Sequence, residues 1–374
     1  MMNHSDSASK HRKRLLLITG TRPDIIKMAS VYHALQKESS LQPFLVHTGQ
    51  QHATMTDGLF EELNIPLPDE YRPYIKQTAE QQTTDIMQWC TAIIDKYNPR
   101  MVIVLGDVNT TVAAALAAVK KNIPVAHIES GLRSHDYSMP EEKNRIITDH
   151  LSEMLFVPSM DAYDNLQIEG IDSARIHFCG NTGADTLFRI RRSAQKKQYC
   201  RKHSLFPGKY IVCTFHRQSN VDSKKALEKL LIAIHYITKI LPVCVPIHPR
   251  TRHNITHFHL EAYIQPSMVF KPIPPVNYTD FISLILDSAM VITDSGGVQE
   301  ESTLLGIPCL TIRNNTERPI TIYKGTNTIV GTDSKTIIYT IRKILNRKNN
   351  IPYIPYGWNG NAASCISSCI KNSV

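Results

Sequence analysis

The fold is decided by the stretch Thr293-Asp294-Ser295-Gly296-Gly297-Val298-Gln299-Glu300-Glu301, which follows an apolar run from Ala289 to Ile292. The apolar run predicts a buried strand, Ser-Gly-Gly predicts a turn into a helix, and Gly306-Ile307-Pro308 predicts the end of that helix. A helix that starts after a glycine turn offers free N–H groups and the positive end of its dipole to an anion. The stretch therefore favours an α/β fold that grips the diphosphate of a sugar nucleotide, although a capped helix start without a ligand fits it equally well.

The composition indicates a soluble globular protein with room for two domains. The chain has 374 residues, of which 42% are hydrophobic and 20% are charged. No apolar run approaches the roughly 20 residues that a membrane span requires. The net charge of +9 suits an anionic ligand, but no basic helix interleaved with aromatic residues points to nucleic acid. Residues 1–14 are polar and basic, so they predict a disordered tail rather than a secretory signal.

The cysteines predict a reduced, cytoplasmic protein without a metal site. The eight cysteines show no Cys-x-x-Cys spacing, and most lie in apolar, strand-like segments where a thiol packs as a small hydrophobe. Cys365 and Cys369 are four residues apart and share one face of a predicted helix. With no further ligand nearby in the sequence, we expect no metal there.

Short β-branched runs alternate with helical patterns along the whole chain, which predicts parallel sheets covered by helices on both faces. Two series of runs predict two doubly wound, Rossmann-like domains. The predicted strands are 15–19, 44–48, 101–105, 125–129, 155–158 and 176–179, then 210–214, 243–247, 268–270, 290–293, 309–312 and 328–330. The predicted boundaries give a first domain over 15–188, a basic linker over 189–209, a second domain over 210–355 and a terminal helix over 356–374 that crosses back to the first domain.

Cations follow the first predicted strand, in Gly20-Thr21-Arg22-Pro23-Asp24-Ile25-Ile26-Lys27. Arg22 and Lys27 would stand at the carboxyl edge of the sheet, where open α/β folds bind ligands. The segment is neither a Walker loop nor a three-glycine dinucleotide fingerprint. Surface salt bridges are the alternative for either cation.

Three acids follow other strands of the first domain. Asp107 comes after Gly106, Glu129 ends an apolar run, and Glu141 opens a predicted helix. Asp107 can instead cap the next helix, and Glu141 can simply complement a helix dipole. A glutamate at the end of a buried strand, however, needs a partner or a task. Carboxylates that converge raise one another's pKa, which suits acid–base catalysis near neutral pH.

The second domain repeats the pattern with basic residues. His216-Arg217 and His248-Pro249-Arg250 follow predicted strands, and each offers donors for a phosphate. Arg318 precedes Pro319 and is therefore held in an extended conformation, where it can clamp a phosphate or pair with Glu317.

Together these motifs resemble the non-hydrolysing bacterial UDP-N-acetylglucosamine 2-epimerases over about residues 15–363. The motifs that carry the resemblance are Gly-Thr-Arg-Pro at 20–23, Gly-Asp at 106–107, His-Ile-Glu-Ser-Gly-Leu-Arg at 127–133, Pro-Glu-Glu-x-Asn-Arg at 140–145, His-Arg at 216–217, Asp-Ser-Gly-Gly-Val-Gln-Glu-Glu at 294–301 and Thr-Glu-Arg-Pro at 316–319. The resemblance implies two Rossmann-like domains facing a cleft, the glycosyltransferase-B arrangement. It also implies reversible epimerisation of UDP-GlcNAc to UDP-ManNAc for surface polysaccharide synthesis by a homodimer, without a cofactor.

The resemblance assigns roles to individual residues. It implies that UDP is eliminated to leave 2-acetamidoglucal and then adds back, with Asp107, Glu129 and Glu141 as the acid–base set. Glu301 would bind the ribose and Phe281 would lie near the uracil. The remaining substrate contacts implied for the diphosphate are Arg22, Lys27, His216, Ser295, Gly296, Gly297 and Arg318.

The sequence departs from the family pattern in places that bear on regulation and substrate choice. Many family members are activated by UDP-GlcNAc at a second site, and Gly49-Gln50-Gln51-His52 resembles the loop that lines it. The usual pattern there is Gly-Gln-His, so the extra glutamine leaves the regulation open. Ser219 stands where glutamate is common and Asn359 where aspartate is usual, which can shift the substrate toward a modified UDP-HexNAc.

Three other functions fit parts of the sequence. A hydrolysing 2-epimerase would release ManNAc and UDP, but its turn usually reads Gly-Ser-Arg-Ala-Glu where this chain has Gly-Thr-Arg-Pro. A glycosyltransferase of the same architecture would need an acceptor site and would not need three converging acids. A sugar-nucleotide sensor would lack a catalytic acid, and none is missing here.

Overall fold

The computed structural model describes residues 12–346 and 354–374, and the chain divides into two compact units. The first unit runs to Thr186 and takes in Tyr356–Val374, and the second is Leu187–Pro355. Most of the predicted tail lies outside the described residues. Lys13 and Arg14, however, belong to the first strand, so the ordered sheet starts before Leu15.

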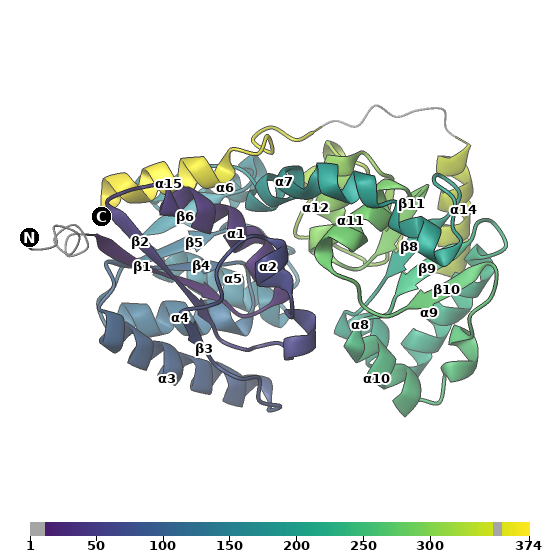
Figure 1. Ribbon diagram of the computed structural model, residues 1–374, viewed down its shortest axis with the longest axis horizontal. Helices are drawn as coiled ribbons and strands as arrows, with labels where there is room; N and C mark the ends of the chain where they lie inside the picture. The colour runs from purple at the N-terminus through teal and green to yellow at the C-terminus, as the bar shows by residue number, and fades with distance from the viewer. Residues whose placement is uncertain (1–11, 347–353) are drawn as a thin grey trace, which may run out of the picture. The chain divides into compact units, whose positions relative to one another are not determined.

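The first unit is built on a parallel sheet of seven strands within the described residues, in the order β3-β2-β1-β4-β5-β6-β7 (Figure 1). The strand bounds are β1 Lys13–Thr19, β2 Leu41–His47, β3 Glu70–Tyr71, β4 Met101–Leu105, β5 Val125–Ile128, β6 Met154–Val157 and β7 Ile176–Phe178. Strands β4, β5 and β6 are buried along their whole length because helices cover both faces. This continuous burial is what the unbroken apolar runs predict.

The second unit repeats the plan with six described strands in the order β10-β9-β8-β11-β12-β13, all of them parallel. The strand bounds are β8 Ile211–Thr214, β9 Val243–Pro246, β10 Phe270–Ile273, β11 Met290–Thr293, β12 Cys309–Thr311 and β13 Asn327–Ile329. The sequence prediction of two doubly wound α/β domains is thus confirmed. The prediction misses the two-residue edge strand β3 and starts β2 three residues late. It also starts β10 two residues early, because Lys271-Pro272 interrupts the apolar run.

Helices connect successive strands in both units. The helix bounds are α1 Arg22–Gln36, α2 Leu59–Glu62, α3 Ala79–Tyr97, α4 Asn109–Lys120, α5 Pro140–Leu151, α6 Met160–Ile168, α7 Thr182–Lys197, α8 Gln218–Val221, α9 Lys224–Ile237, α10 Pro249–His257, α11 Tyr278–Leu286, α12 Gly296–Leu305, α13 Ile320–Tyr323, α14 Ser334–Leu345 and α15 Ala362–Ser373. The basic segment 189–209 that the sequence presents as a linker falls mostly in α7 and a following 3-10 turn, Tyr199–His203. No helix among these described residues is both long and apolar enough to cross a membrane.

The terminal helix α15 belongs to the first unit, where it packs along α1 (Figure 1). Its apolar side chains Ile366 and Ile370 are fully buried. The Asp185 carboxylate caps its start by accepting hydrogen bonds from the N–H groups of Ala362 and Ala363, at 3.2 and 3.0 Å. The helix is therefore part of the fold of the first unit rather than an appendage.

The cysteine prediction needs a correction. Cys179 and Cys365 form a disulfide whose Cα atoms are 5.5 Å apart and whose ends are 186 residues apart in sequence. Sequence spacing carries no sign of this pair, because the cysteines meet only when α15 packs beside the end of β7.

Both sheets reverse their strand order at one place, and this positions the candidate sites. In the first unit the chain leaves β1 toward β2 and later returns to the other side of β1 with β4. In the second unit β8 and β11 hold the corresponding places. Open α/β sheets bind ligands beyond the carboxyl ends of such neighbouring strands, so each unit offers one ligand-binding edge.

Candidate functional site

In the first unit, the loops after β1 and β4 meet closely at this edge. A Cβ on Gly20 would lie 2.1 Å from Oγ1 of Thr110, so only glycine lets the β1 loop approach the start of α4. Gly106, in the β4 loop, has a φ of +72°, a left-handed conformation that glycine adopts without strain. The two glycines thus bring the residues that follow them, Arg22 and Asp107, to the same edge of the sheet.

Lys27 and Glu129 form an ion pair at this edge, with side chains that are only 8% and 5% exposed. Lys27 is on α1 and Glu129 directly follows β5. Glu129 has a φ of +67°, which is costly for a non-glycine residue and which the surrounding structure must impose. The pair places a carboxylate beside Gly106, with Oε2 of Glu129 lying 3.8 Å from the position of a Cβ on that glycine.

Asp24 adds a second buried carboxylate at the same point, and its role was not predicted from the sequence. Its Oδ1 lies 3.9 Å from the same Cβ position on Gly106. The pKa of Asp24 is raised to about 7, chiefly by burial and to a lesser extent by the nearby charge of Asp107, against the lowering effect of hydrogen bonds from the N–H groups of Gly20 and Thr21. We call Asp24, Asp107 and Glu129 the carboxylate cluster.

Asp107 does not cap the following helix, contrary to the alternative drawn from the sequence. The N-cap of α4 is Val108, and the Asp107 carboxylate instead accepts from Nη1 of Arg145 at 3.0 Å. Its side chain remains 26% exposed, whereas Arg145 is 1% exposed. Asp107 is therefore an accessible carboxylate held in place by a buried guanidinium.

The two glutamates that open α5 have different surroundings. Glu142 is buried and accepts hydrogen bonds from the N–H groups of Ser134 and His135, and it lies 3.3 Å from Nη2 of Arg145. Glu141 is partly exposed, and its side chain forms no ion pair within the described part of the chain. Glu129 thus lies close to Gly106, the residue before Asp107, whereas Glu141 makes no hydrogen bond or ion pair with either acid among the described residues.

A buried network of His127, Asp149 and Arg133 fixes the backbone next to the carboxylate cluster. His127, on β5, directs Nδ1 to the Asp149 carboxylate at 2.7 Å and Nε2 to the carbonyl oxygen of Gly106 at 2.8 Å. The two ring nitrogens therefore connect the Asp149 carboxylate to the Gly106 carbonyl. Arg133 pairs with the same Asp149 at 2.7 Å. This network fixes the Gly106 carbonyl, and with it the backbone that carries Asp107.

The raised pKa of Asp24 predicts a specific pH dependence of stability. The folded state holds the proton up to about pH 7, whereas the unfolded chain releases it near the usual 3.8. Stability therefore falls as the pH rises from about 4 to 7, because the folded state binds more protons over that range. We expect Asp24→Asn to remove this dependence and to be more stable than the wild type at pH 8, by up to about 4 kcal/mol. Urea unfolding at pH 5 and pH 8 measures the difference, and parallel curves for the two proteins would contradict it.

In the second unit, Asp294 organises the ligand-binding edge. Its fully buried carboxylate accepts from the N–H groups of His216 and Arg217, both at 3.0 Å, and from Nδ2 of Asn220 at 2.9 Å. It thereby ties the loop after β8 to the loop after β11. The next residue, Ser295, is the N-cap of α12, so the predicted strand, turn and helix start are confirmed.

A buried ion-pair cluster lies against the start of α12. Arg318 pairs with Glu300 at 2.7 Å and with Glu317. Glu317 is 1% exposed and also pairs with Arg217 at 3.3 Å and with Arg313 at 2.8 Å. In this structure Arg318 therefore holds two carboxylates, so a contact with phosphate would require it to share or exchange these partners.

Gly296 makes this arrangement possible. A Cβ there would lie 2.3 Å from Nη1 of Arg318 and 2.6 Å from Oε1 of Glu317. The helix start and the ion-pair cluster are therefore in direct contact, which sequence spacing does not reveal. Gly297 has open space at the same position, as a close approach by a ligand requires.

The other predicted contacts of the second unit lie on neighbouring elements. His216 places Nδ1 3.4 Å from the Asp294 carboxylate and stacks on His248, with ring centroids 5.0 Å apart. Phe281 is partly exposed in the first turns of α11, and Glu301 is partly exposed on α12.

The predicted regulatory segment, which contains Gln50, Gln51 and His52, has a structural role at the ligand-binding edge of the first unit. Oε1 of Gln50 accepts from the N–H of Thr110 at 2.8 Å, and Oε1 of Gln51 accepts from the N–H of Arg22 at 2.9 Å. The two glutamines thus cap the starts of α4 and α1, the helices that follow Gly106 and Gly20. His52 is exposed and contacts Thr54.

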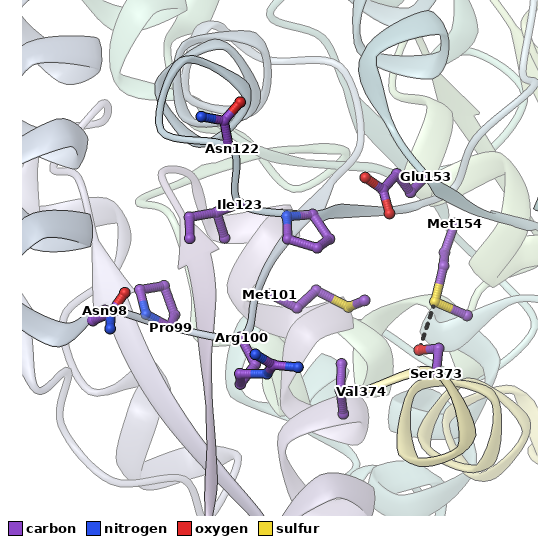
Figure 2. A pocket seen from close by; sticks show the side chains of 11 residues that line it. Asn98, Pro99, Arg100, Met101, Asn122, Ile123, Glu153, Met154, Ser373 and Val374 are labelled. Atoms are coloured by element: carbon purple, nitrogen blue, oxygen red, sulfur yellow. Dashed lines mark hydrogen bonds between the residues drawn. The ribbon is translucent and has the colours of Figure 1, made fainter.

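A pocket of about 430 Å³ lies at the opposite edge of the first sheet, near the C-terminus (Figure 2). It is lined by loops that precede β4, β5 and β6, and Ser373 there contacts Sδ of Met154 at 3.2 Å. None of the predicted site residues lines it. The lining residues are Asn98, Pro99, Arg100, Met101, Asn122, Ile123, Pro124, Glu153, Met154, Ser373 and Val374.

Known proteins resemble this chain across both units. The sequence profile of the UDP-N-acetylglucosamine 2-epimerase family matches residues 33–371. The UDP-N-acetylglucosamine 2-epimerase of Methanocaldococcus jannaschii is 38% identical over 343 residues, which are 90% of this chain and 93% of that protein. The UDP-2,3-diacetamido-2,3-dideoxy-D-glucuronate 2-epimerase of Pseudomonas aeruginosa is 38% identical over 339 residues, which are 89% and 93% of the two chains.

Solved structures show the same likeness. The crystal structure of the Methanocaldococcus jannaschii UDP-GlcNAc 2-epimerase in complex with UDP-GlcNAc and UDP matches with a TM-score of 0.90 and 37% identity, covering 96% of this chain and 100% of that one. The Neisseria meningitidis UDP-GlcNAc 2-epimerase bound to UDP-GlcNAc matches with a TM-score of 0.88 and 32% identity, over 96% and 100% of the chains. The predicted glycosyltransferase-B type of fold is thereby confirmed.

Proposed function

Because the chain belongs to the UDP-N-acetylglucosamine 2-epimerase family, we propose that it reversibly inverts C2 of UDP-GlcNAc to give UDP-ManNAc without net hydrolysis. The observation that carries the proposal is the carboxylate cluster at the reversal point of the first sheet. Two acids with different surroundings, one paired with Lys27 and one with Arg145, supply the acid and the base that inversion requires.

The reaction requires a base to remove the C2 proton while the C1–O bond to UDP breaks. No carbonyl next to C2 makes that proton acidic, so stabilisation of the leaving UDP must supply much of the driving force. The products of this step are 2-acetamidoglucal and UDP. Return of a proton to C2 from the opposite face, together with addition of UDP to C1, completes the inversion.

The two units have separate tasks in this scheme. Asp107 and Glu129 exchange protons with C2, and Glu141 joins them when substrate is bound. Lys27 pairs with Glu129 and Arg145 with Asp107, so a basic side chain holds each carboxylate in place. Arg22 contributes positive charge at the same edge.

The second unit holds UDP. The Ser295 hydroxyl and the N–H groups of Gly296 and Gly297 meet the diphosphate, with His216 and Arg318 as cationic partners. Glu301 accepts hydrogen bonds from the ribose, and Phe281 contacts the uracil. The support for this assignment is the α12 start, whose turn is fixed by the buried Asp294.

The proposal extends to features that follow from the family alone. These are a homodimer, a cytoplasmic location, a role in surface polysaccharide synthesis and activation by a UDP-sugar near Gln50, Gln51 and His52. Because Gln50 and Gln51 cap α4 and α1, a ligand at that segment would act on α1, which carries Asp24, and on the start of α4, which closely follows Asp107.

Proton NMR of the purified protein with UDP-GlcNAc tests the proposed function. We expect UDP-ManNAc to accumulate to an equilibrium mixture, with UDP appearing only in trace amounts. Stoichiometric free ManNAc and UDP would identify a hydrolysing enzyme. Inactivity toward UDP-GlcNAc with turnover of a diacetamido uronate analogue would place the chain with the Pseudomonas relative instead.

A further inference from the structure

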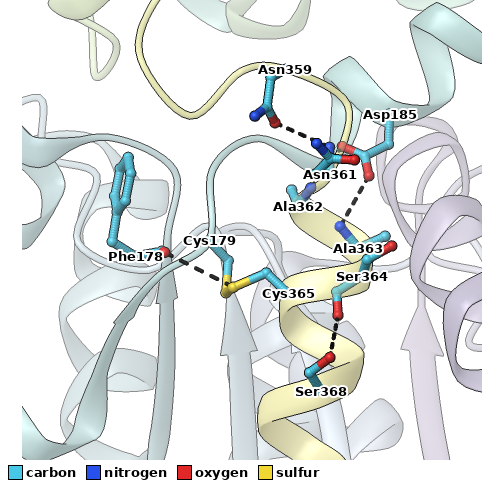
Figure 3. The surroundings of a disulfide bond; sticks show 10 residues. All are labelled: Phe178, Cys179, Asp185, Asn359, Asn361, Ala362, Ala363, Ser364, Cys365 and Ser368. Carbon is cyan, nitrogen blue, oxygen red and sulfur yellow. Dashed lines mark hydrogen bonds between the residues drawn. A yellow bond between two sulfur atoms is a disulfide. The ribbon is translucent and has the colours of Figure 1, made fainter.

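Three sulfur atoms from distant parts of the sequence meet at the end of β7. Cys179 follows β7, and Cys365 and Cys369 lie one turn apart on α15. The three Sγ atoms all lie within 4.8 Å of one another. Those of Cys179 and Cys365 are joined as a disulfide (Figure 3). The sulfur of Cys369 is thus positioned beside an existing disulfide.

This cluster differs from the rest of the cysteines. Cys90, Cys200, Cys213, Cys244 and Cys309 are all buried free thiols, and burial raises the pKa of each. They behave as small hydrophobic residues with little thiolate. Burial raises the pKa of Cys369 as well, so the difference is one of access. Cys369 is the one free cysteine of the described residues that is partly exposed, and Cys365 is partly exposed too. Reagents in solution can therefore reach the cluster from the α15 side.

We propose that Cys179, Cys365 and Cys369 form a thiol–disulfide exchange site that reacts with small thiols, with Cys369 as the exchanging thiol. The Cys369 thiolate attacks Sγ of Cys179 and forms a Cys179–Cys369 disulfide. Cys365 leaves as a thiolate and takes up the proton that Cys369 lost, so this step is redox-neutral. Complete reduction consumes two molecules of an external thiol and releases them as one disulfide, leaving Cys179 and its partner as thiols.

The cross-link lies where it can affect the fold of the first unit. Around it, Phe178 stacks on Tyr356 with ring centroids 5.6 Å apart, and a Cβ on Gly180 would meet the carbonyl oxygen of Gly357 at 1.9 Å. These contacts already join the β7 end to the segment before α15. The disulfide makes this junction covalent and closes a loop of 186 residues.

The junction between β7 and α15 also lies close to the ligand-binding edge of the first unit. Gly183 lies two residues after Asn181, and a Cβ on Gly183 would lie 3.5 Å from Cε of Lys27. Helix α15 packs along α1, the helix that carries Lys27. A change of disulfide partner among Cys179, Cys365 and Cys369 therefore affects the packing of α15 against α1, and does not act directly on the acid–base residues.

The experiment uses the full-length protein equilibrated in glutathione redox buffers, then denatured, alkylated and mapped by mass spectrometry. Under oxidising buffer we expect two linkages, Cys179–Cys365 and Cys179–Cys369, to coexist. We expect Cys365→Ser to form only Cys179–Cys369, and Cys369→Ser to form only Cys179–Cys365. Cys90→Ala is the matched control, because it removes a buried thiol outside the cluster and should leave both linkages in place.

Thermal unfolding of the protein in the same redox buffers, before denaturation and alkylation, gives a second measurement. Closing so long a loop should raise the melting temperature of the oxidised wild type by about 5–10 °C over the reduced protein. Cys179→Ser should abolish this difference.

Three results would overturn the proposal. The first is that all eight cysteines of the wild type are alkylated when the oxidised protein is denatured. The second is that Cys365→Ser forms no Cys179–Cys369 linkage. The third is that the reduced wild type binds one Cd²⁺ per chain with a thiolate charge-transfer band that Cys369→Ser loses, which would make Cys179, Cys365 and Cys369 a metal site. These readouts are independent of the epimerase assay, so a failed activity test leaves this proposal to stand or fall separately.

Discussion

Replacing Glu129 by glutamine is expected to lower kcat by about 10²–10⁴-fold while leaving the affinity for UDP nearly unchanged. Glutamine keeps the size of the side chain but cannot exchange a proton with C2. The residue is 5% exposed and paired with Lys27, so its carboxylate is held in a fixed position. The epimerisation rate by NMR and the dissociation constant of UDP by calorimetry give the two quantities.

The matched control is Glu153→Gln, which makes the same chemical change at the opposite edge of the same sheet, just before β6. Its kcat should equal that of the wild type. A Glu129→Gln enzyme with a normal kcat would remove Glu129 from the acid–base set. A loss of UDP affinity as large as the loss of kcat would show that Glu129 acts in binding rather than in proton transfer.

Asp294→Asn is expected to weaken UDP binding by about 100-fold. The Asp294 carboxylate accepts from the N–H groups of His216 and Arg217 and from Asn220, and it is fully buried. An amide replaces one acceptor oxygen with a donor, so at least one buried N–H loses its partner, at a cost of about 1–3 kcal/mol. The loops after β8 and β11 are then no longer tied together where the diphosphate is expected. Calorimetry with UDP measures the effect.

The control for this change is Asp222→Asn, since Asp222 is exposed and pairs with Arg250 at the surface of the same unit. Exposed pairs of this kind contribute about 0–1 kcal/mol, so UDP affinity should stay at the wild-type value. If Asp294→Asn melts at the same temperature as the wild type and binds UDP equally well, the loop contacts do not form the diphosphate site.

The fold could be predicted closely from the sequence because the local residue patterns agree with how the strands and helices pack. The strands β4 and β11 occupy the predicted residues, and α12 starts after Ser295 as predicted. Buried parallel strands are continuous apolar runs, and the glycine turns mark where each one ends. The predicted position of β10 is wrong because Lys271 and Pro272 interrupt the apolar pattern of a strand that is only half buried.

The sequence predicts where the candidate site residues lie in the fold but not what they contact. Asp107 and Glu129 follow β4 and β5, as predicted, and the ends of parallel strands share one sheet edge. Asp24 was missed because its capping position at the start of α1 explains it without function. The Arg145 partner of Asp107 and the His127 support of Gly106 depend on helix α5 and strand β5 meeting β4, which no local pattern encodes.

The disulfide shows the same limit. Cys179 and Cys365 are 186 residues apart, and their approach depends on where α15 packs. Cysteine spacing reports only local pairs. The prediction of reduced thiols therefore followed from composition, and the structure corrects it at one pair.

The most direct test of the central claim is the fate of the C2 proton in D₂O. An enzyme that removes and returns this proton with Asp107 and Glu129 should place deuterium at C2 of the recovered UDP-sugar. Incorporation should follow epimerisation in the wild type and vanish in Glu129→Gln. Epimer formed with protium fully retained at C2 would contradict the account.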